Sequence, residues 1–250
     1  MPDINKANRQ VCDVLFCDVK TKKPYLKFDT ANTTTAGIEG DSVYAMAKGS
    51  RKIAFANPLT GTMSIEAQVY PFKFFSLFTD GVIDTTAVYA ETKDVTATAG
   101  GTLSIAEPTA GTIETNTVFA YPYDSFGDES TLIAGSYSEG IFTATTESEI
   151  VADKKYTVGY IVNKTAVRKS SFRNYKLPKD YYVTMSTLDK DEEGVLTPFK
   201  IVAYKAMAQR NFELSFNSEG DPATVTATFD LMEDKDGNII DMIEVTDESE

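Results

Sequence analysis

The sequence predicts a mainly β protein with one flanking α-helix, and three observations lead to this fold class. Many short segments alternate between apolar and polar residues at the period of a strand, and turn-forming residues separate them. One segment, residues 61–81, instead joins a strand to a helical pattern. No apolar run reaches the length of a membrane span. A chain of 250 residues with these features forms one large β domain or two smaller ones.

The first sixty residues are expected to form short strands around one long loop. The alternating pattern predicts strands at residues 11–19, 25–28, 42–47 and 51–55. Residues 29–41 are rich in Thr, Gly and Asn and show no periodicity, so we expect a long loop or an extended hairpin tip there. Loops of this length in compact domains are often functional.

The helical pattern follows the strand predicted for residues 62–67. Pro71 suits the first turn of a helix because its missing N–H would have no partner there, and Gly81 suits the end. The segment between them is too short to be helical in water by itself. Its aromatic rings must therefore pack against a sheet or a neighbouring subunit. The apolar residues of this segment are Phe72, Phe74, Phe75, Leu77 and Phe78.

The middle of the chain, residues 84–162, is richer in Thr, Ala and Gly and is expected to form a small sandwich or barrel. Its predicted strands are residues 102–105, 118–121, 141–144 and 156–162.

Residues 163–178 hold a basic cluster that has two interpretations. It could contact an acidic partner, or it could be a solvated connector between two β units. The basic residues are Lys164, Arg168, Lys169, Arg173 and Lys176.

The last part of the chain returns to longer strands, predicted at residues 181–188, 199–204, 211–216, 223–231 and 239–243. Acidic turns occupy residues 189–194 and 233–238. The first turn resembles the start of a calcium loop, but Lys200 stands where the final Glu ligand belongs. We therefore expect solvated hairpin ends and no metal site.

Composition excludes several classes of function. With 37 acidic against 24 basic residues the net charge is −13, which argues against a nucleic-acid-binding surface and against docking on an anionic membrane. The chain has no His, which excludes Ser-His-Asp and Cys-His catalysis. Its two cysteines, Cys12 and Cys17, are expected to be reduced thiols. No phosphate-binding or nucleophile motif is present, so we expect no enzyme and no cofactor.

Three segments together resemble the tail tube (major tail) proteins of tailed bacteriophages. They are residues 43–61, the strand-to-helix segment 61–75, and residues 205–231 with their Asp-rich turn. The resemblance implies a β-sandwich or half-barrel with one flanking α-helix, formed by residues 1–83 and 163–250. It also implies that residues 84–162 are an inserted, immunoglobulin-like β domain.

The resemblance implies a virion structural protein of the tail, assembled in the host cytoplasm. Such subunits form rings, commonly of six, that stack into a tube with other tail proteins, and DNA passes through the lumen without specific binding. The acidic composition fits a lumen along which phosphates slide. The Thr-rich residues 29–41, and the strands that follow them, would reach the next subunit or ring. Candidate interface residues are Thr33, Thr34, Thr35, Phe72, Phe75, Phe78, Arg168, Lys169 and Arg173.

Two other classes of function stay open on the sequence alone. A virion surface or decoration protein would use residues 84–162 to bind a host or capsid. A carbohydrate-binding or hydrolytic β protein would need a cleft with exposed Tyr and paired carboxylates, and the absence of Trp counts against it.

Overall fold

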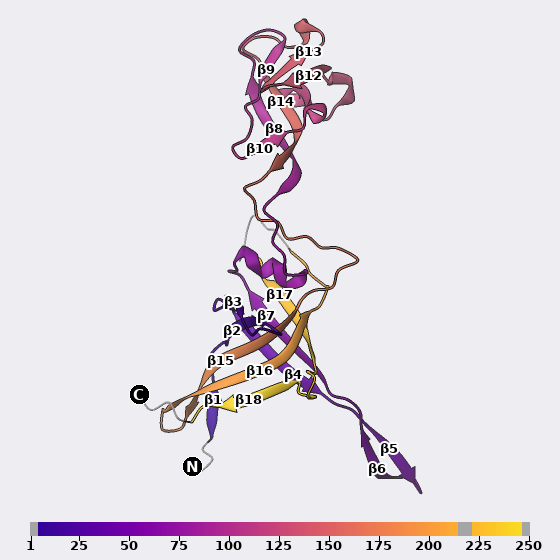
Figure 1. The fold of residues 1–250 in the computed structure, drawn as a ribbon, viewed down its shortest axis with the longest axis vertical. Coiled ribbons are helices and arrows are strands. Elements are labelled where there is room, and N and C mark those ends of the chain that lie inside the picture. Colours follow the sequence, from indigo (N-terminus) through magenta and orange to yellow (C-terminus); the bar gives the residue numbers. More distant parts are fainter. Residues whose placement is uncertain (1–4, 215–221, 247–250) are drawn as a thin grey trace. The chain divides into compact units, whose positions relative to one another are not determined.

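The computed structural model describes residues 5–214 and 222–246, which form two compact units (Figure 1). Unit 1 comprises Met1–Val82 and Ser171–Glu250, and unit 2 comprises Ile83–Ser170. Strands dominate both units, so the prediction of a mainly β chain is confirmed.

Unit 1 is built on an antiparallel sheet that has nine strands among the described residues. The main path runs β3-β2-β15-β16-β17-β7-β4, while β1 pairs with β15 and β18 pairs with β16. The strands are β1 Lys6–Asn8, β2 Asp13–Asp18, β3 Pro24–Phe28, β4 Thr33–Glu39, β7 Thr60–Ala67, β15 Asp180–Asp191, β16 Leu196–Ala208, β17 Val225–Met232 and β18 Ile240–Glu244. A separate hairpin is formed by β5 Ser42–Ala47 and β6 Ser50–Ala56.

The sheet of unit 1 curls around its own core. Strands β2 and β17 are separated in the sheet by β15 and β16, yet the rings of Phe16 on β2 and Phe229 on β17 lie 5.4 Å apart. Both rings are fully buried, as is Tyr181 on β15, whose ring meets Phe16 edge to face at 5.8 Å. Alternate residues of these strands face this core, which is the period-2 pattern that predicts them.

The flanking helix is not an α-helix, and the prediction of one was wrong in this respect. Element η1, Phe72–Phe78, is a 3₁₀-helix. Its terminal bonds join residues three apart: the Phe74 N–H donates to the carbonyl of Pro71, and the Thr79 N–H to that of Ser76. A 3₁₀-helix brings side chains three residues apart into one row. That geometry lets the aromatic rings of this segment stack along one side of the helix.

Unit 2 has a separate core. Between its two long strands lie strands of three or four residues and 3₁₀-helices of three residues. The long strands, β8 Ala87–Thr96 and β14 Lys155–Lys164, pair along their full length. The shorter strands are β9 Thr102–Ser104, β10 Gly111–Ile113, β11 Phe119–Pro122, β12 Gly135–Ser138 and β13 Ile141–Ala144. The 3₁₀-helices are η2 Thr115–Thr117, η3 Tyr123–Ser125, η4 Glu129–Thr131 and η5 Glu147–Glu149. The immunoglobulin-like character of this region stays a prediction.

Two further sequence predictions differ from the structure. The loop expected at residues 29–41 contains strand β4, which pairs with β7 from Thr33 to Glu39. β-branched Thr suits such a half-exposed edge strand, although it gives no apolar alternation. The strand expected at residues 211–216 is not formed at 211–214, and residues 215 and 216 lie outside the described part of the chain.

Candidate functional site

The most unusual surface of unit 1 is a hairpin that extends from the sheet. The β4–β7 ladder ends at the pair Glu39–Thr60, and the β5–β6 pairing begins at Ser42–Ala56 and runs to Ala47–Ser50. We call residues 42–56 the arm; it projects away from the sheet in Figure 1. Every residue of the arm is exposed. An isolated two-stranded hairpin is marginally stable in water, so this one needs a further surface.

One face of the arm is apolar over two successive residue pairs. The register places Val43 opposite Phe55, and Ala45 opposite Ile53. Directly paired residues of antiparallel strands share a face, so these four side chains form one patch. Val43, Ile53 and Phe55 are 58%, 56% and 58% exposed. Exposed contiguous apolar surface of this kind marks an interaction site.

The other face and the tip of the arm carry positive charge. The Arg51 guanidinium lies over the Tyr44 ring, 4.3 Å from its centroid. Lys48 and Gly49 both have positive φ, as the turns that match the twist of a two-residue hairpin require. Lys48, Arg51 and Lys52 are cationic, and residues 42–56 contain no acidic residue.

The three threonines predicted as interface residues lie on β4, beside the base of the arm. Thr33 and Thr35 are exposed on one face, whereas Thr34 faces the core side and accepts a hydrogen bond from the Cys12 N–H at 3.1 Å. The Thr35 hydroxyl is 2.6 Å from that of Ser64 on β7. Thr34 therefore has a structural role within the chain, and the interface role of all three stays a prediction.

The three phenylalanines predicted at an interface form a row on η1. Phe78 is buried in the core of unit 1, while Phe72 and Phe75 are half-buried. The Phe212 ring covers the row, with centroids 4.7 Å from Phe78 and 5.7 Å from Phe75, and Phe172 stacks on Phe212. Within the chain these rings anchor η1, and their contact with a neighbour stays a prediction.

The basic cluster of residues 163–178 is largely engaged inside each unit. In unit 2, Lys164 pairs with Glu91 at 2.6 Å and Lys169 with Asp84 at 3.7 Å. In unit 1, Lys176 pairs with Asp80, and the Arg173 carbonyl accepts a hydrogen bond from Arg210. That Arg168, Lys169 and Arg173 contact an acidic partner stays a prediction. Such a partner would compete with the contacts that this cluster makes within each unit.

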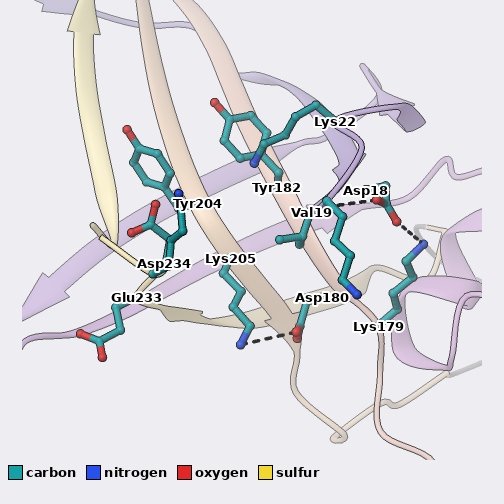
Figure 2. Close-up of a pocket in the computed structure, with 12 residues that line it drawn as sticks. Asp18, Val19, Lys22, Lys179, Asp180, Tyr182, Tyr204, Lys205, Glu233 and Asp234 are labelled. Atoms are coloured by element: carbon teal, nitrogen blue, oxygen red, sulfur yellow. Dashed lines mark hydrogen bonds and ion pairs between the residues drawn. The ribbon is translucent and has the colours of Figure 1, made fainter. Parts of the chain in front are cut away.

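An open groove of about 1070 Å³ lies along β15 and β16, and Figure 2 shows the residues that line it. The Lys22 ammonium lies 3.7 Å from the centroid of the Tyr182 ring. The Tyr204 hydroxyl donates to Asp241, a bond that raises the pKa of Tyr204 to about 12. A tyrosine with this pKa keeps its proton at neutral pH, so it is not suited to act as a general base.

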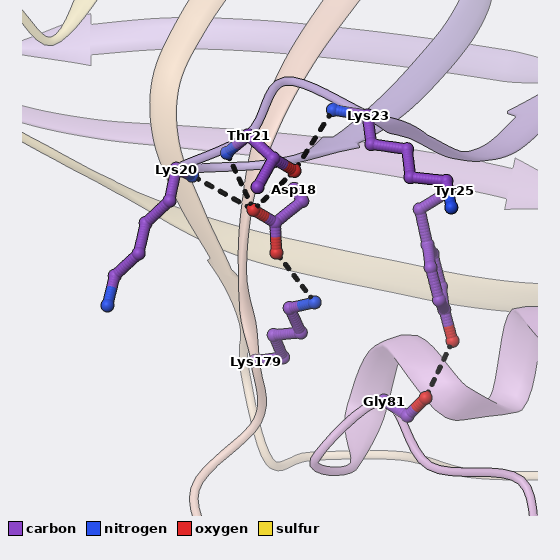
Figure 3. A network of polar contacts seen from close by, with 7 residues as sticks. All are labelled: Asp18, Lys20, Thr21, Lys23, Tyr25, Gly81 and Lys179. Carbon is purple, nitrogen blue, oxygen red and sulfur yellow. Dashed lines mark hydrogen bonds and ion pairs between the residues drawn. The ribbon is translucent and has the colours of Figure 1, made fainter.

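Asp18 is one of four acidic residues that line this groove, and its contacts favour the ionised carboxylate. Asp18 accepts hydrogen bonds from the Lys20 and Thr21 N–H groups and the Thr21 hydroxyl, and Lys179 lies 2.9 Å from it (Figure 3). The Thr21 N–H, followed by Lys179, holds the pKa of Asp18 well below its usual range. This arrangement fixes the turn after β2 and offers no carboxyl poised for proton transfer.

The resemblance implied that the strands of the arm reach the next subunit or ring, but no residue of the apolar face was named as a candidate interface residue. The signal was the two short apolar runs, which are separated by a turn and hold cationic residues without any acidic one. Periodicity alone did not reveal that no other part of the chain among residues 5–214 and 222–246 covers them.

A family model described as the YomU/Tube protein family matches residues 9–245. No curated protein matches the chain. Among the described residues, no helix is long and apolar enough to cross a membrane.

Proposed function

We propose that this chain, which belongs to the YomU/Tube protein family, is a non-enzymatic structural subunit that builds the tail tube of a bacteriophage virion. Subunits assemble into rings of six, and the rings stack with other tail proteins into a channel through which DNA leaves the particle. The observation that carries the proposal is the exposed apolar arm, because a tube needs each subunit to reach its neighbour.

The energetics of the arm favour its burial in an assembly. More than half of the Val43, Ile53 and Phe55 side chains remains accessible to solvent. Burying the rest of each contributes on the order of 1 kcal/mol, since complete burial of such a side chain contributes about 1.5–3 kcal/mol. Each subunit of a ring repeats the contact, so the arms act together across a tube.

The wall of the channel is proposed to be the face of the sheet that points away from the core over β4, β7 and β17. The register sets Thr35, Ser64 and Thr228 side by side in one row, and a second row holds Thr33, Glu66 and Thr226. These three strands contain carboxylates and hydroxyls but no Lys or Arg. Without cations such a face cannot neutralise phosphates, so DNA would pass without being held.

Electron microscopy of an arm variant tests the proposal. The variant replaces the apolar face by Val43→Thr, Ile53→Thr and Phe55→Thr, because β-branched Thr is polar and suits a strand. A matched control replaces exposed apolar residues of unit 2, Val88→Thr and Ile141→Thr, which are 58% and 48% exposed.

The wild type and the control are expected to form rings or tubes in negative stain at high concentration. The arm variant is expected to stay monomeric with an unchanged far-ultraviolet circular dichroism spectrum. A wild type that stays monomeric, or an arm variant that assembles as well as the control, would contradict the proposal.

A further inference from the structure

The sheet of unit 1 has a second apolar surface, which is only partly covered by the described part of this chain, where β16 and β18 extend beyond the core. The register places Ile201 opposite Met242 and Phe199 opposite Glu244. These residues lie on the side of the sheet that faces the core of unit 1 in the neighbouring part of β15. Ile201 pairs with Met185, which is buried, and directly paired residues share a side. Met242 is 67% exposed, while Phe199 and Ile201 are half-buried.

Carboxylates surround this apolar face. Asp189 and Asp191 of β15 lie on the same side of the sheet as Met185, because they follow it by four and six residues and side chains alternate along a strand. They pair with Asn8 and Lys6 of β1. Glu192 and Glu193 occupy the exposed turn that joins β15 to β16. We call this region, with Phe199, Ile201 and Met242, the acidic end. Lys190 and Lys200 occupy alternate positions and point to the opposite side.

The charges of the two apolar surfaces are complementary. The arm has three cationic residues and no acidic one, in a chain whose net charge is −13. Residues 189–193 hold four acidic residues and one basic residue. Lys6 pairs with Glu244, so the cation on this side of the sheet is already compensated. Complementary potentials select one partner and suppress others.

The arm and the acidic end lie at opposite ends of the sheet of unit 1 (Figure 1). An arm therefore cannot reach the acidic end of its own chain. We infer that the arm of one copy docks its apolar face on the acidic end of a second copy. Such a head-to-tail contact leaves one arm and one acidic end free at each step, and it generates rings or filaments. The inference rests on the proposed function only in requiring that the chain assembles with itself.

A charge-swap experiment tests this pairing. The arm variant is Arg51→Glu with Lys52→Glu, the acidic-end variant is Glu192→Lys with Glu193→Lys, and a fourth protein combines all four changes. A control, Lys20→Glu with Lys235→Glu, changes the net charge as the arm variant does, but at exposed positions outside both surfaces. The readout is the lowest concentration at which each protein polymerises, measured by sedimentation at low ionic strength.

Each swap alone is expected to raise this concentration about tenfold, since close like charges replace attractive pairs. The combined protein is expected to return to within about threefold of the wild type, while the control stays at the wild-type value. Raising the salt from about 50 mM to about 500 mM should weaken the polymerisation of the wild type and of the combined protein alike.

The outcomes separate this inference from the proposed function. A wild type that polymerises, with an arm swap that the acidic-end swap does not rescue, overturns the docking assignment and leaves the tube proposal standing. A wild type that never polymerises overturns both. Loss of assembly in the control would also overturn the assignment, because the effect would then follow from net charge.

Discussion

Replacing Phe74 by Ala tests whether η1 is held by the core of its own chain. The Phe74 side chain is fully buried, and its ring centroid lies 5.1 Å from that of Phe28, 5.6 Å from that of Phe78 and 5.8 Å from that of Tyr70. Truncating a buried Phe to Ala costs about 3–5 kcal/mol. Three ring contacts, each contributing about 0.5–1.5 kcal/mol beyond burial, place Phe74→Ala near the upper end of that range.

Phe72→Ala is the matched control on the same helix. Phe72 is half-buried, and its ring centroid lies 5.6 Å from that of Phe75. Its replacement by Ala is expected to cost about 1–2 kcal/mol, because a half-buried ring loses less apolar burial than the fully buried Phe74.

Hydrogen exchange read peptide by peptide during urea titration measures both variants. Phe74→Ala should lower the free energy of opening across η1 and β3 but leave β14 unchanged, because β14 belongs to the separate core of unit 2. The reasoning is refuted if Phe72→Ala destabilises the free chain as much as Phe74→Ala does. It is also refuted if Phe74→Ala costs less than about 1.5 kcal/mol.

Three further predictions follow from single contacts. The Tyr181 hydroxyl is buried without a hydrogen-bond partner among the described residues, so Tyr181→Phe should leave the free energy of unfolding unchanged or raise it by up to about 1 kcal/mol, measured in urea. A loss of stability would contradict this. A Cβ at Gly135 would lie 2.3 Å from the Thr143 carbonyl oxygen, so Gly135→Ala should destabilise unit 2 by about 1–3 kcal/mol, and an unchanged thermal midpoint would contradict it. The pKa of Asp18 is lower in the folded chain, so its contribution to stability is present above pH ~4 and is lost as the pH falls below that value. Asp18→Asn should be less stable at pH 7 and flatten the acid branch of the stability curve, and identical acid branches would contradict this.

The core strands could be predicted from the sequence because their apolar residues recur at every second position. The run after Asp180 shows this pattern and forms a strand whose alternate residues are buried. The run before Asp18 is continuously apolar over residues 14–17 and also forms a strand. Strand β4 was missed because Thr, Ala and Gly give little contrast between its two faces. Its pairing with β7 is a tertiary contact, and the local sequence does not specify it.

The type of the flanking helix could not be read from spacing. Phe72, Phe75 and Phe78 recur at intervals of three, which suits the faces of both an α-helix and a 3₁₀-helix. The choice depends on tertiary contacts of the segment, among them Phe212 from a distant part of the chain. Buried Ser76 adds a local bond, since its hydroxyl donates to the Lys73 carbonyl three residues earlier.

The arm shows why a candidate site can be harder to predict than the strands that form it. Alternating apolar residues are typical both of a half-buried strand and of a strand whose apolar face is covered only by another subunit. The sequence gives the side chains and not the surface that covers them. Val43, Ile53 and Phe55 read as ordinary core residues, and the structure leaves them exposed. Residues 42–56 contain no acidic residue, but the core strand β16 also has none and contains two lysines, so this feature does not by itself distinguish the arm from the core strands.

The charge of the arm also bears on how uncontrolled aggregation is avoided. An exposed apolar strand pair is a template for unspecific pairing, and proteins protect such edges with Lys and Arg. Arg51 and Lys52 lie next to the apolar face, where two arms that meet face to face would bring like charges together. On the proposed pairing the same cations meet carboxylates of the acidic end. Arg51 and Lys52 would then disfavour contact between two arms and favour contact between an arm and an acidic end. Neutralising these two residues should therefore increase disordered aggregation and weaken ordered assembly.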